Sequence, residues 1–376
     1  MKQRVLVLGA GFGGLELSTL LSESLGDEVQ VTMIDKSDTY VLGYSKLDVM
    51  FGHATLDSVR LPYRNFVKPG VQLLRETITA IDPTTRRVTT DAGSHDCDYL
   101  VVALGADYDF SATPGLDGAN EFYSVAGANR LRDILPTFSS GNAVIGVCGA
   151  PYKCPPAPSE CALMLHDHLL NRGVRNQCEI TLVMPLSSPV PPSPETSKAL
   201  LSAFAERDIK FVLQRRVSAV DVSRRVASLD DGSELACNLF LGVPKHRAAA
   251  VVEASGLAEA GWVSVNPRTL ETKFTNVYAI GDIANTGTPK AGVFAEGAAK
   301  AVASALVARV RGVGESSLYA GTGSCYIEYG AGRVGRVDID FFSGPKPTGT
   351  YNEPDVALRA DKERFGVSRR ARWFGL

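Results

Sequence analysis

A glycine-rich turn between two apolar runs lies in the first 35 residues, and it restricts the fold more than any other part of the chain. Residues 4–8 form a short apolar run, which is typical of a buried parallel strand. The glycines follow at once, residues 12–25 have a helical pattern, and residues 29–34 read as a second strand that ends at Asp35. The order predicts a β-α-β unit that opens an α/β fold.

The glycines of this turn stand where side chains would obstruct a bound dinucleotide. Gly9 permits the tight turn, Gly11 lets the backbone approach a pyrophosphate at the helix N-terminus, and Gly14 lets the helix pack closely on the strand. Asp35 lies 21 residues beyond Gly14, where a carboxylate can accept hydrogen bonds from the adenosine ribose. The set predicts a dinucleotide site at the N-terminus.

Two later strands carry further signatures. Residues 98–106 form a strand that ends at Gly105, and residues 276–282 form another that ends in Gly-Asp at Asp282, before an alanine-rich helix from about residue 293 to 310. These segments resemble those of flavoproteins related to glutathione reductase, in which the Gly-Asp pair holds the ribityl-phosphate part of FAD. The resemblance implies FAD and a split domain whose last piece returns late in the chain.

A second β-α unit lacks the glycines that a nucleotide needs. Residues 143–149 form a strand where the family usually carries a second fingerprint for NAD(P)H, but residues 150–158 read Ala-Pro-Tyr-Lys-Cys-Pro-Pro-Ala-Pro before a helix over 159–170. Prolines remove N–H donors, and Tyr152 and Lys153 add bulk. We expect the fold of this unit to persist without its nucleotide site, which disfavours an NAD(P)H dehydrogenase.

The chain of 376 residues is long enough for two or three domains. We predict an α/β fold of two Rossmann-like dinucleotide-binding domains, like those of glutathione reductase. Residues 1–110 and 262–312 form the split FAD domain, 111–261 the second domain with its degenerate NAD(P)H site, and 313–376 a small C-terminal domain with a basic tail. Within the second domain we expect a helix over 195–207 and strands over 210–213, 217–222, 226–229 and 238–242.

Two cysteines stand in loops of unusual composition. Cys154 lies in the proline-rich loop that replaces the second fingerprint, and Cys325 lies in Gly-Thr-Gly-Ser-Cys-Tyr. Over nearly the whole chain, the sequence resembles the flavoprotein family of sulfide:quinone oxidoreductases and the flavin subunit of flavocytochrome c sulfide dehydrogenase. In that family the matching cysteines face the flavin and can form a disulfide or a bridging polysulfide. The resemblance implies that hydrosulfide attacks this bridge, the freed thiolate adds to the flavin, and two electrons enter FAD.

The resemblance assigns roles to two further residues. Glu160, six residues after Cys154, matches a family acid that handles thiol protons, although a solvated glutamate at a helix start explains it equally well. Lys290 and the helix N-terminus after it are expected to stabilise negative charge on reduced flavin. His246 matches a loop near the flavin edge, but an exposed loop histidine is the favoured interpretation.

The other cysteines and histidines predict no metal site. The seven cysteines include no CxxC pair, and four of them border or lie in apolar elements typical of core thiols, namely Cys97, Cys148, Cys161 and Cys237. Cys178 has no evident partner. His166 and His168 are two apart on a helix and point to different faces. We therefore expect no metal.

Charge is unevenly distributed. The net charge of −2 argues against a general nucleic-acid binder, and no apolar run reaches the length of a membrane span. No signal peptide is evident, so we expect a cytoplasmic protein.

Residues 357–376 hold six basic and two acidic residues, and four apolar ones fall on one side of an ideal helix: Leu358, Phe365, Trp373 and Leu376. We expect this tail to contact the inner face of the membrane, unless it docks on its own domain or on a second subunit of a homo-oligomer.

These features predict an FAD-dependent enzyme that oxidises sulfide or a persulfide through Cys154 and Cys325 and passes the electrons to membrane quinone. Two alternatives stay open. A type II NAD(P)H:quinone oxidoreductase would be reduced rapidly by NADH, and a flavin electron-transfer subunit would work only with a cytochrome or another protein partner.

Overall fold

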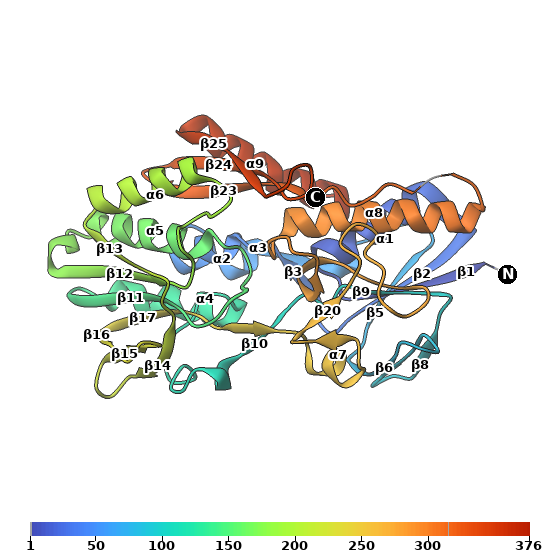
Figure 1. The fold of residues 1–376 in the computed structure, drawn as a ribbon, viewed down its shortest axis with the longest axis horizontal. Coiled ribbons are helices and arrows are strands. Elements are labelled where there is room, and N and C mark those ends of the chain that lie inside the picture. Colours follow the sequence, from blue (N-terminus) through green and yellow to red (C-terminus); the bar gives the residue numbers. More distant parts are fainter. Residues whose placement is uncertain (1, 315) are drawn as a thin grey trace.

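The computed structural model describes residues 2–314 and 316–376. The first residue of the predicted FAD domain, Met1, and Glu315 in the predicted C-terminal domain lie outside the described residues. Two parallel sheets lie side by side, and a third, antiparallel sheet runs along one side of both (Figure 1). The predicted α/β class is confirmed.

The first sheet is parallel throughout and holds the predicted β-α-β unit. In spatial order its strands are β21 (Val277–Ala279), β9 (Tyr99–Val102), β1 (Gln3–Leu8), β2 (Val29–Asp35) and β5 (Val71–Arg75). The chain therefore leaves this sheet after β9 and returns to it at β21. Helices α1 (Phe12–Leu25) and α8 (Gly292–Arg311) pack against each other over the sheet.

The second sheet has the order β13 (Ile209–Leu213), β12 (Cys178–Met184), β11 (Gly141–Val147) and β17 (Leu239–Val243), again all parallel. Helices α5 (Ala157–Asn171) and α6 (Pro194–Glu206) follow β11 and β12, as the apolar patterns predict. The fold of the second nucleotide unit is thus retained although its glycine fingerprint is absent.

The first half of the molecule is built on the first sheet and the second half on the second sheet. A two-stranded antiparallel link, β10 (Asp107–Asp109) with β18 (Lys245–Arg247), joins these two halves near the middle of the molecule (Figure 1). Directly after β18, Ala248, Val252 and Leu257 enter the core cluster that contains Leu6 and Leu8 of β1. By these contacts the chain rejoins the core of the first sheet at Ala248, earlier than residue 262, where the sequence predicts the FAD domain to resume. The apolar pattern of a short helix does not show which of two cores the helix joins.

The C-terminal region folds as a hairpin-linked sheet and a helix. Strands β23 (Thr322–Gly330), β24 (Arg333–Asp340) and β25 (Thr348–Asp355) are antiparallel, and α9 (Val356–Arg369) continues into a π-helical turn over Arg370–Phe374. Strand β23 packs on α5 of the second half and on α8 of the first, so this sheet covers both halves (Figure 1).

The remaining elements are short. The other helices are α2 (Ser45–Met50), α3 (Leu56–Val59), α4 (Val125–Ile134) and α7 (Ala250–Ala254). The other strands are β3 (Thr39–Val41), β4 (Arg60–Pro62), β6 (Ile78–Asp82), β7 (Arg87–Thr90), β8 (Ser94–Asp96), β14 (Val217–Asp221), β15 (Val226–Leu229), β16 (Glu234–Ala236), β19 (Ala258–Glu259), β20 (Trp262–Ser264) and β22 (Ala284–Asn285). In the described ranges, no helix combines the length and the apolar character that a bilayer span requires.

Candidate functional site

The glycine turn between β1 and α1 is closely fitted to its surroundings. Gly9 has a φ of +100°, and a Cβ there would lie 2.5 Å from the carbonyl oxygen of Ala103. A Cβ at Gly14 would collide with the carbonyl oxygen of Gly9. A Cβ at Gly11 would meet no described atom within 4 Å, and no described side chain caps the N-terminus of α1. The turn therefore offers free backbone N–H groups at a helix N-terminus, which suits a pyrophosphate.

Asp35 stands at the end of β2, beside this turn. Its Oδ2 accepts a hydrogen bond from the backbone N of Ala10 at 2.8 Å, and its Oδ1 accepts one from Ser37 N at 2.8 Å. The carboxylate is thus held at the carboxyl edge of the sheet, next to the glycines. This is the position that the spacing predicts for a ribose-binding acid.

Gly105 and Asp282 lie at the same edge. Gly105 follows β9 with a φ of +69°, and Asp282 follows β21, the neighbour of β9. Because β1, β9 and β21 run parallel, their carboxyl ends meet here. Burial raises the pKa of Asp282, and three lysines, Lys46, Lys153 and Lys290, oppose this rise. The uncapped helix, the two acids and the glycine turns fit the parts of FAD.

Lys290 is buried at the start of the segment that leads into α8. Its Nζ donates to the carbonyl oxygen of Asp282 at 2.6 Å and lies 3.5 Å from the centre of the Trp262 ring. Burial lowers the pKa of Lys290 to about 8, and Asp282 counters that shift. The lysine therefore fixes the Gly-Asp turn and places a positive charge beside it.

The loop that replaces the second fingerprint reaches across to the first half. The backbone N of Cys154 donates to the carbonyl oxygen of Lys290 at 2.7 Å, and Lys153 forms a parallel bridge with Lys290. Tyr152 is buried, and its hydroxyl donates to Pro155 O at 3.4 Å. The loop thus carries Cys154 to the edge where Asp282 lies and leaves no glycine turn at the start of α5.

Cys154 and Cys325 share one neighbouring carboxylate. Cys154 has a φ of +48° and precedes α5, and Cys325 lies on β23, which packs on α5. Burial raises the pKa of the Cys325 thiol to about 12 and that of Cys154 further, and the Glu160 carboxylate adds to both rises. Both are free thiols in the structure. The two predicted cysteines, 171 positions apart in sequence, are therefore brought to the same acid.

Glu160 is buried, with 2% of its surface exposed, so the interpretation as a solvated helix-start residue is wrong. It lies in the first turn of α5, and its Oε1 accepts a hydrogen bond from the backbone N of Glu328 at 3.0 Å. Burial raises the pKa of Glu160 to about 7, against the lowering effect of Lys362. A carboxyl group with a pKa near neutrality can accept and release a proton at physiological pH.

His246 is not an exposed loop residue, contrary to the favoured expectation. It lies on β18 with 4% of its surface exposed. Its imidazole packs edge-on against the rings of Tyr108 and Tyr123, at centroid distances of 5.0 and 5.3 Å. Its Nδ1 donates to Pro244 O at 2.8 Å. Burial lowers the pKa of His246 to about 3, so the imidazole is neutral. The interdomain pairing of β10 and β18, invisible in the sequence, causes this burial.

Cys97, Cys148, Cys161 and Cys237 lie in the core, as predicted, and Cys178 is buried as well. His166 pairs with Asp167 at 3.1 Å, and His168 packs against Phe51. Within the described part of the chain, no cluster of three or more His, Cys, Asp or Glu side chains is arranged to hold a metal ion.

The basic tail docks on the first half, which is the alternative to lipid contact considered above. Trp373, with 1% exposure, donates from Nε1 to Glu16 Oε2 at 2.8 Å, and Arg372 pairs with Glu16 and Glu23. Arg369 pairs with Glu296 of α8 at 2.7 Å. The apolar face that the helical pattern predicts therefore packs largely on protein.

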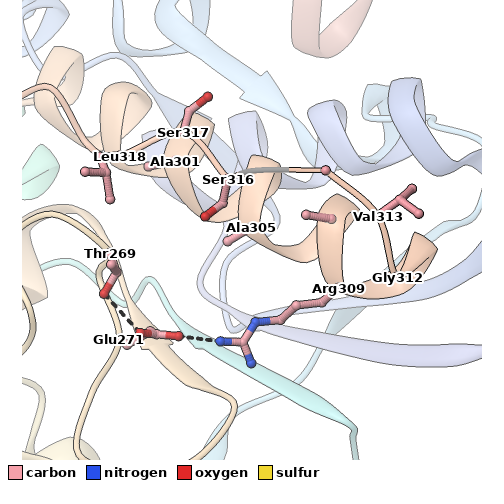
Figure 2. A pocket seen from close by; sticks show the side chains of 12 residues that line it. Thr269, Glu271, Ala301, Ala305, Arg309, Gly312, Val313, Ser316, Ser317 and Leu318 are labelled. Atoms are coloured by element: carbon pink, nitrogen blue, oxygen red, sulfur yellow. Dashed lines mark hydrogen bonds and ion pairs between the residues drawn. The ribbon is translucent and has the colours of Figure 1, made fainter.

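A surface pocket of about 500 Å³ lies elsewhere, between α8 and the segment that precedes β21 (Figure 2). Its lining holds the ion pair of Arg309 with Glu271, and Thr269 donates to the same glutamate (Figure 2). None of the predicted site residues lines it.

Sequence reasoning missed the residues that surround Glu160. Lys362 of α9 donates from Nζ to Glu328 Oε1 at 2.6 Å, and both side chains are buried. A basic residue in a mostly polar helix and a glutamate in a strand carry no distinguishing pattern, so only the docking of α9 on the C-terminal sheet brings them together.

Comparison with known proteins identifies the family of the chain. The family described as pyridine nucleotide-disulphide oxidoreductase matches residues 3–308. The mitochondrial sulfide:quinone oxidoreductase of Mus musculus is 26% identical over 374 residues, which cover 93% of this chain and 80% of that protein. A type II NADH:quinone oxidoreductase of Staphylococcus aureus is 26% identical over 306 residues, which cover 75% and 74%.

Among solved structures, the sulfide:quinone oxidoreductase of Aquifex aeolicus superposes with a TM-score of 0.87. The alignment covers 98% of this chain and 91% of that one, at 22% sequence identity. At this identity the likeness concerns the fold alone.

Proposed function

Because the chain belongs to the pyridine nucleotide-disulphide oxidoreductase family, we propose that it oxidises sulfide or a persulfide through Cys154 and Cys325 and passes the electrons to quinone. The chain is an FAD-dependent oxidoreductase. Gly9, Gly11 and Gly14 with Asp35 would hold the adenosine and pyrophosphate parts of FAD, and Gly105 and Asp282 the ribityl-phosphate part. Bound there, FAD supplies a two-electron acceptor.

The cysteines carry the sulfur chemistry in this proposal. In the oxidised pair, an S–S bond joins Cys154 to Cys325. Hydrosulfide attacks one of the two sulfurs, so a new S–S bond forms, the Cys154–Cys325 bond breaks, and the other cysteine leaves as a thiolate. The attacked cysteine then carries a persulfide, whose proton passes to Glu160.

The structure supports this assignment chiefly through one contact, the hydrogen bond from Cys154 N to Lys290 O at 2.7 Å. It ties the cysteine loop of the second half to the segment that follows the Gly-Asp turn of the first. The same loop has prolines where NAD(P)H would need backbone donors. In this proposal the loop places Cys154, rather than a bound nucleotide, beside the flavin.

The test is an anaerobic titration of the yellow holoenzyme with sulfide and, in parallel, with NADH, read from the flavin absorbance. Sulfide should bleach the wild type, and Cys154→Ser or Cys325→Ser should slow bleaching by a factor on the order of 10³ or more. Cys178→Ala serves as the matched control and should bleach normally, because Cys178 is buried at the start of β12 and its charged neighbours are Arg172 and Arg175 rather than Glu160. Unchanged bleaching in both serine variants would overturn the proposal.

The second candidate is NADH:quinone oxidoreduction, which the Staphylococcus aureus relative favours. Rapid bleaching by NADH and none by sulfide would establish it. The proline-filled loop before α5 is the observation against it, since helix N-terminal N–H groups are needed to bind the pyrophosphate.

We further propose that the protein contacts a membrane, where quinone resides, through the apolar residues that the docked tail leaves exposed. Val367 and Leu376 are 61% and 58% exposed, and Arg364 and Arg370 lie on the same segment. Val67, also exposed, precedes Lys68, whose Nζ donates to Arg372 O at 2.6 Å. Apolar side chains beside cations suit an anionic lipid surface.

A further inference from the structure

Four charged side chains from four different elements meet beside the two cysteines. Glu160 comes from α5, Glu328 from β23, Asp48 from α2, and Lys362 from α9. Each of the three acids acts on Lys362 electrostatically, and Lys362 acts on Glu160 and Asp48 in return. One ammonium therefore faces three carboxyl groups in a largely buried cluster.

Contacts fix the place of the ammonium. Lys362 has 8% of its surface exposed, its Nζ donates to Glu328 Oε1 at 2.6 Å, and it lies 5.2 Å from the centre of the Tyr44 ring. The backbone N of Glu328 in turn donates to Glu160 Oε1 at 3.0 Å. The lysine of the C-terminal helix is thus two contacts away from the acid beside Cys154.

We propose that Lys362 is a positioning residue for the cysteine chemistry: its charge holds Glu160 in the state that accepts the thiol or persulfide proton. The inference rests on the proposed function, in which Glu160 takes that proton. Lys362 touches neither cysteine in this scheme and acts through the carboxyl cluster.

The sign of each effect on Glu160 follows from charge. Lys362 favours the carboxylate and lowers the pKa of Glu160, whereas Glu328 and Asp48 raise it, as does burial. Without the lysine, Glu160 would lose the cation that lowers its pKa, and burial together with Glu328 and Asp48 would hold it protonated at neutral pH. The other basic groups at the cluster, Arg359 and His53, lower the pKa of Asp48. A protonated Glu160 cannot accept a proton, so the group would be useless as a base.

Two variants shift the balance in opposite directions. Lys362→Met removes the cation and should move the titration midpoint of Glu160 upward by more than one pH unit, which is a change of more than tenfold in its ionisation ratio at a given pH. Glu328→Gln removes a neighbouring negative charge, keeps the backbone hydrogen bond to Glu160, and should move the midpoint downward. If Lys362 had only a structural role, the two variants would not shift the titration midpoint of Glu160 in opposite directions.

The midpoint is measured by infrared spectroscopy of the holoenzyme across pH, from the carbonyl band of the protonated carboxyl group. Glu160→Gln identifies the band by removing it. Arg364→Met is the matched control, because Arg364 lies on the same helix as Lys362 with a 76% exposed side chain. In this variant the titration midpoint of Glu160 should equal that of the wild type. Lys362→Arg should restore the wild-type midpoint.

An unchanged or lowered midpoint in Lys362→Met would overturn the inference. If that variant does not fold, the downward shift in Glu328→Gln carries the test, and its absence counts against the inference in the same way. The band titrates without sulfide, so a failed proposal for sulfide oxidation, seen in the cysteine variants, is distinguishable from a failed role of Lys362.

Discussion

Trp373 donates its indole N–H to Glu16 Oε2 at 2.8 Å, and this bond ties the last residues of the chain to the helix that follows the glycine turn. Glu16 is buried on α1, and Arg372 supplies its counter-charge. The Trp373 ring also packs edge-on against Phe12, at a centroid distance of 5.3 Å. Phe12 is the residue between Gly11 and Gly13 in the sequence. The C-terminus therefore packs against the glycine turn and the helix that follows it.

Trp373→Ala should destabilise the protein and weaken FAD retention together. The change leaves a cavity in an aromatic cluster and takes a partner from a buried carboxylate, so we expect a loss of about 3–5 kcal/mol in the free energy of unfolding. Urea denaturation and FAD release on a desalting column measure the two effects. Leu376→Ala, at an exposed site three residues away, should change the free energy by less than about 0.5 kcal/mol. Equal stability of the two variants would show that the docked tail is dispensable.

Lipid contact should depend on the outward side of the tail. Val367→Asp combined with Leu376→Asp should weaken binding to anionic vesicles by at least about tenfold, because both apolar side chains leave the interface. Co-sedimentation with phosphatidylserine vesicles measures this, and binding of the wild type should fall as salt is raised. Trp373 faces the protein, so its loss should affect vesicle binding only as far as it unfolds the tail. Full vesicle binding by the double variant would remove Val367 and Leu376 from the contact.

The glycine turn offers a matched pair of substitutions. A Cβ at Gly14 collides with the Gly9 carbonyl, so Gly14→Ala should impair folding itself. A Cβ at Gly11 meets no described atom within 4 Å, so Gly11→Ala should fold normally yet bind FAD at least about tenfold more weakly, because the methyl group occupies the approach of the pyrophosphate. Circular dichroism reports the fold and flavin content reports the binding. Normal flavin content in Gly11→Ala would move the pyrophosphate away from this turn.

Local patterns predicted the central elements because buried parallel strands are short apolar runs and the turn residues between them are chemically constrained. The bounds of β1, α1 and β2 follow from residues 3–35 alone. The environment of Trp373 does not follow from the local sequence, since the apolar pattern of a helix face is the same whether that face contacts lipid or protein. Only the buried acid on α1, 357 positions away, decides between them.

The burial of Glu160 and His246 is likewise set by distant contacts. Glu160 reads as a helix-start acid until β23 packs over it, and His246 reads as a loop residue until β18 pairs with β10. Their neighbours in sequence predict only a helix-start acid and a loop histidine, whereas the partners that bury them lie 168 and 138 positions away, at Glu328 and Tyr108. Candidate residues were therefore predictable, but their protonation was not.

The protonation of Glu160 leads to a pH-dependence prediction. Since burial raises the pKa of Glu160 to about 7, its base form is lost as pH falls through 7, and sulfide-driven flavin bleaching should slow on the acidic side. Glu160→Gln should lower the rate by about 10²–10⁴ and abolish this limb, because no proton acceptor remains. Anaerobic stopped-flow absorbance over pH 5.5 to about 8.5 measures both, with hydrosulfide concentration rather than total sulfide held constant, since hydrosulfide itself titrates in this range. A Glu160→Gln enzyme that keeps the acidic limb would assign it to another group and leave Glu160 with a purely structural hydrogen bond to Glu328.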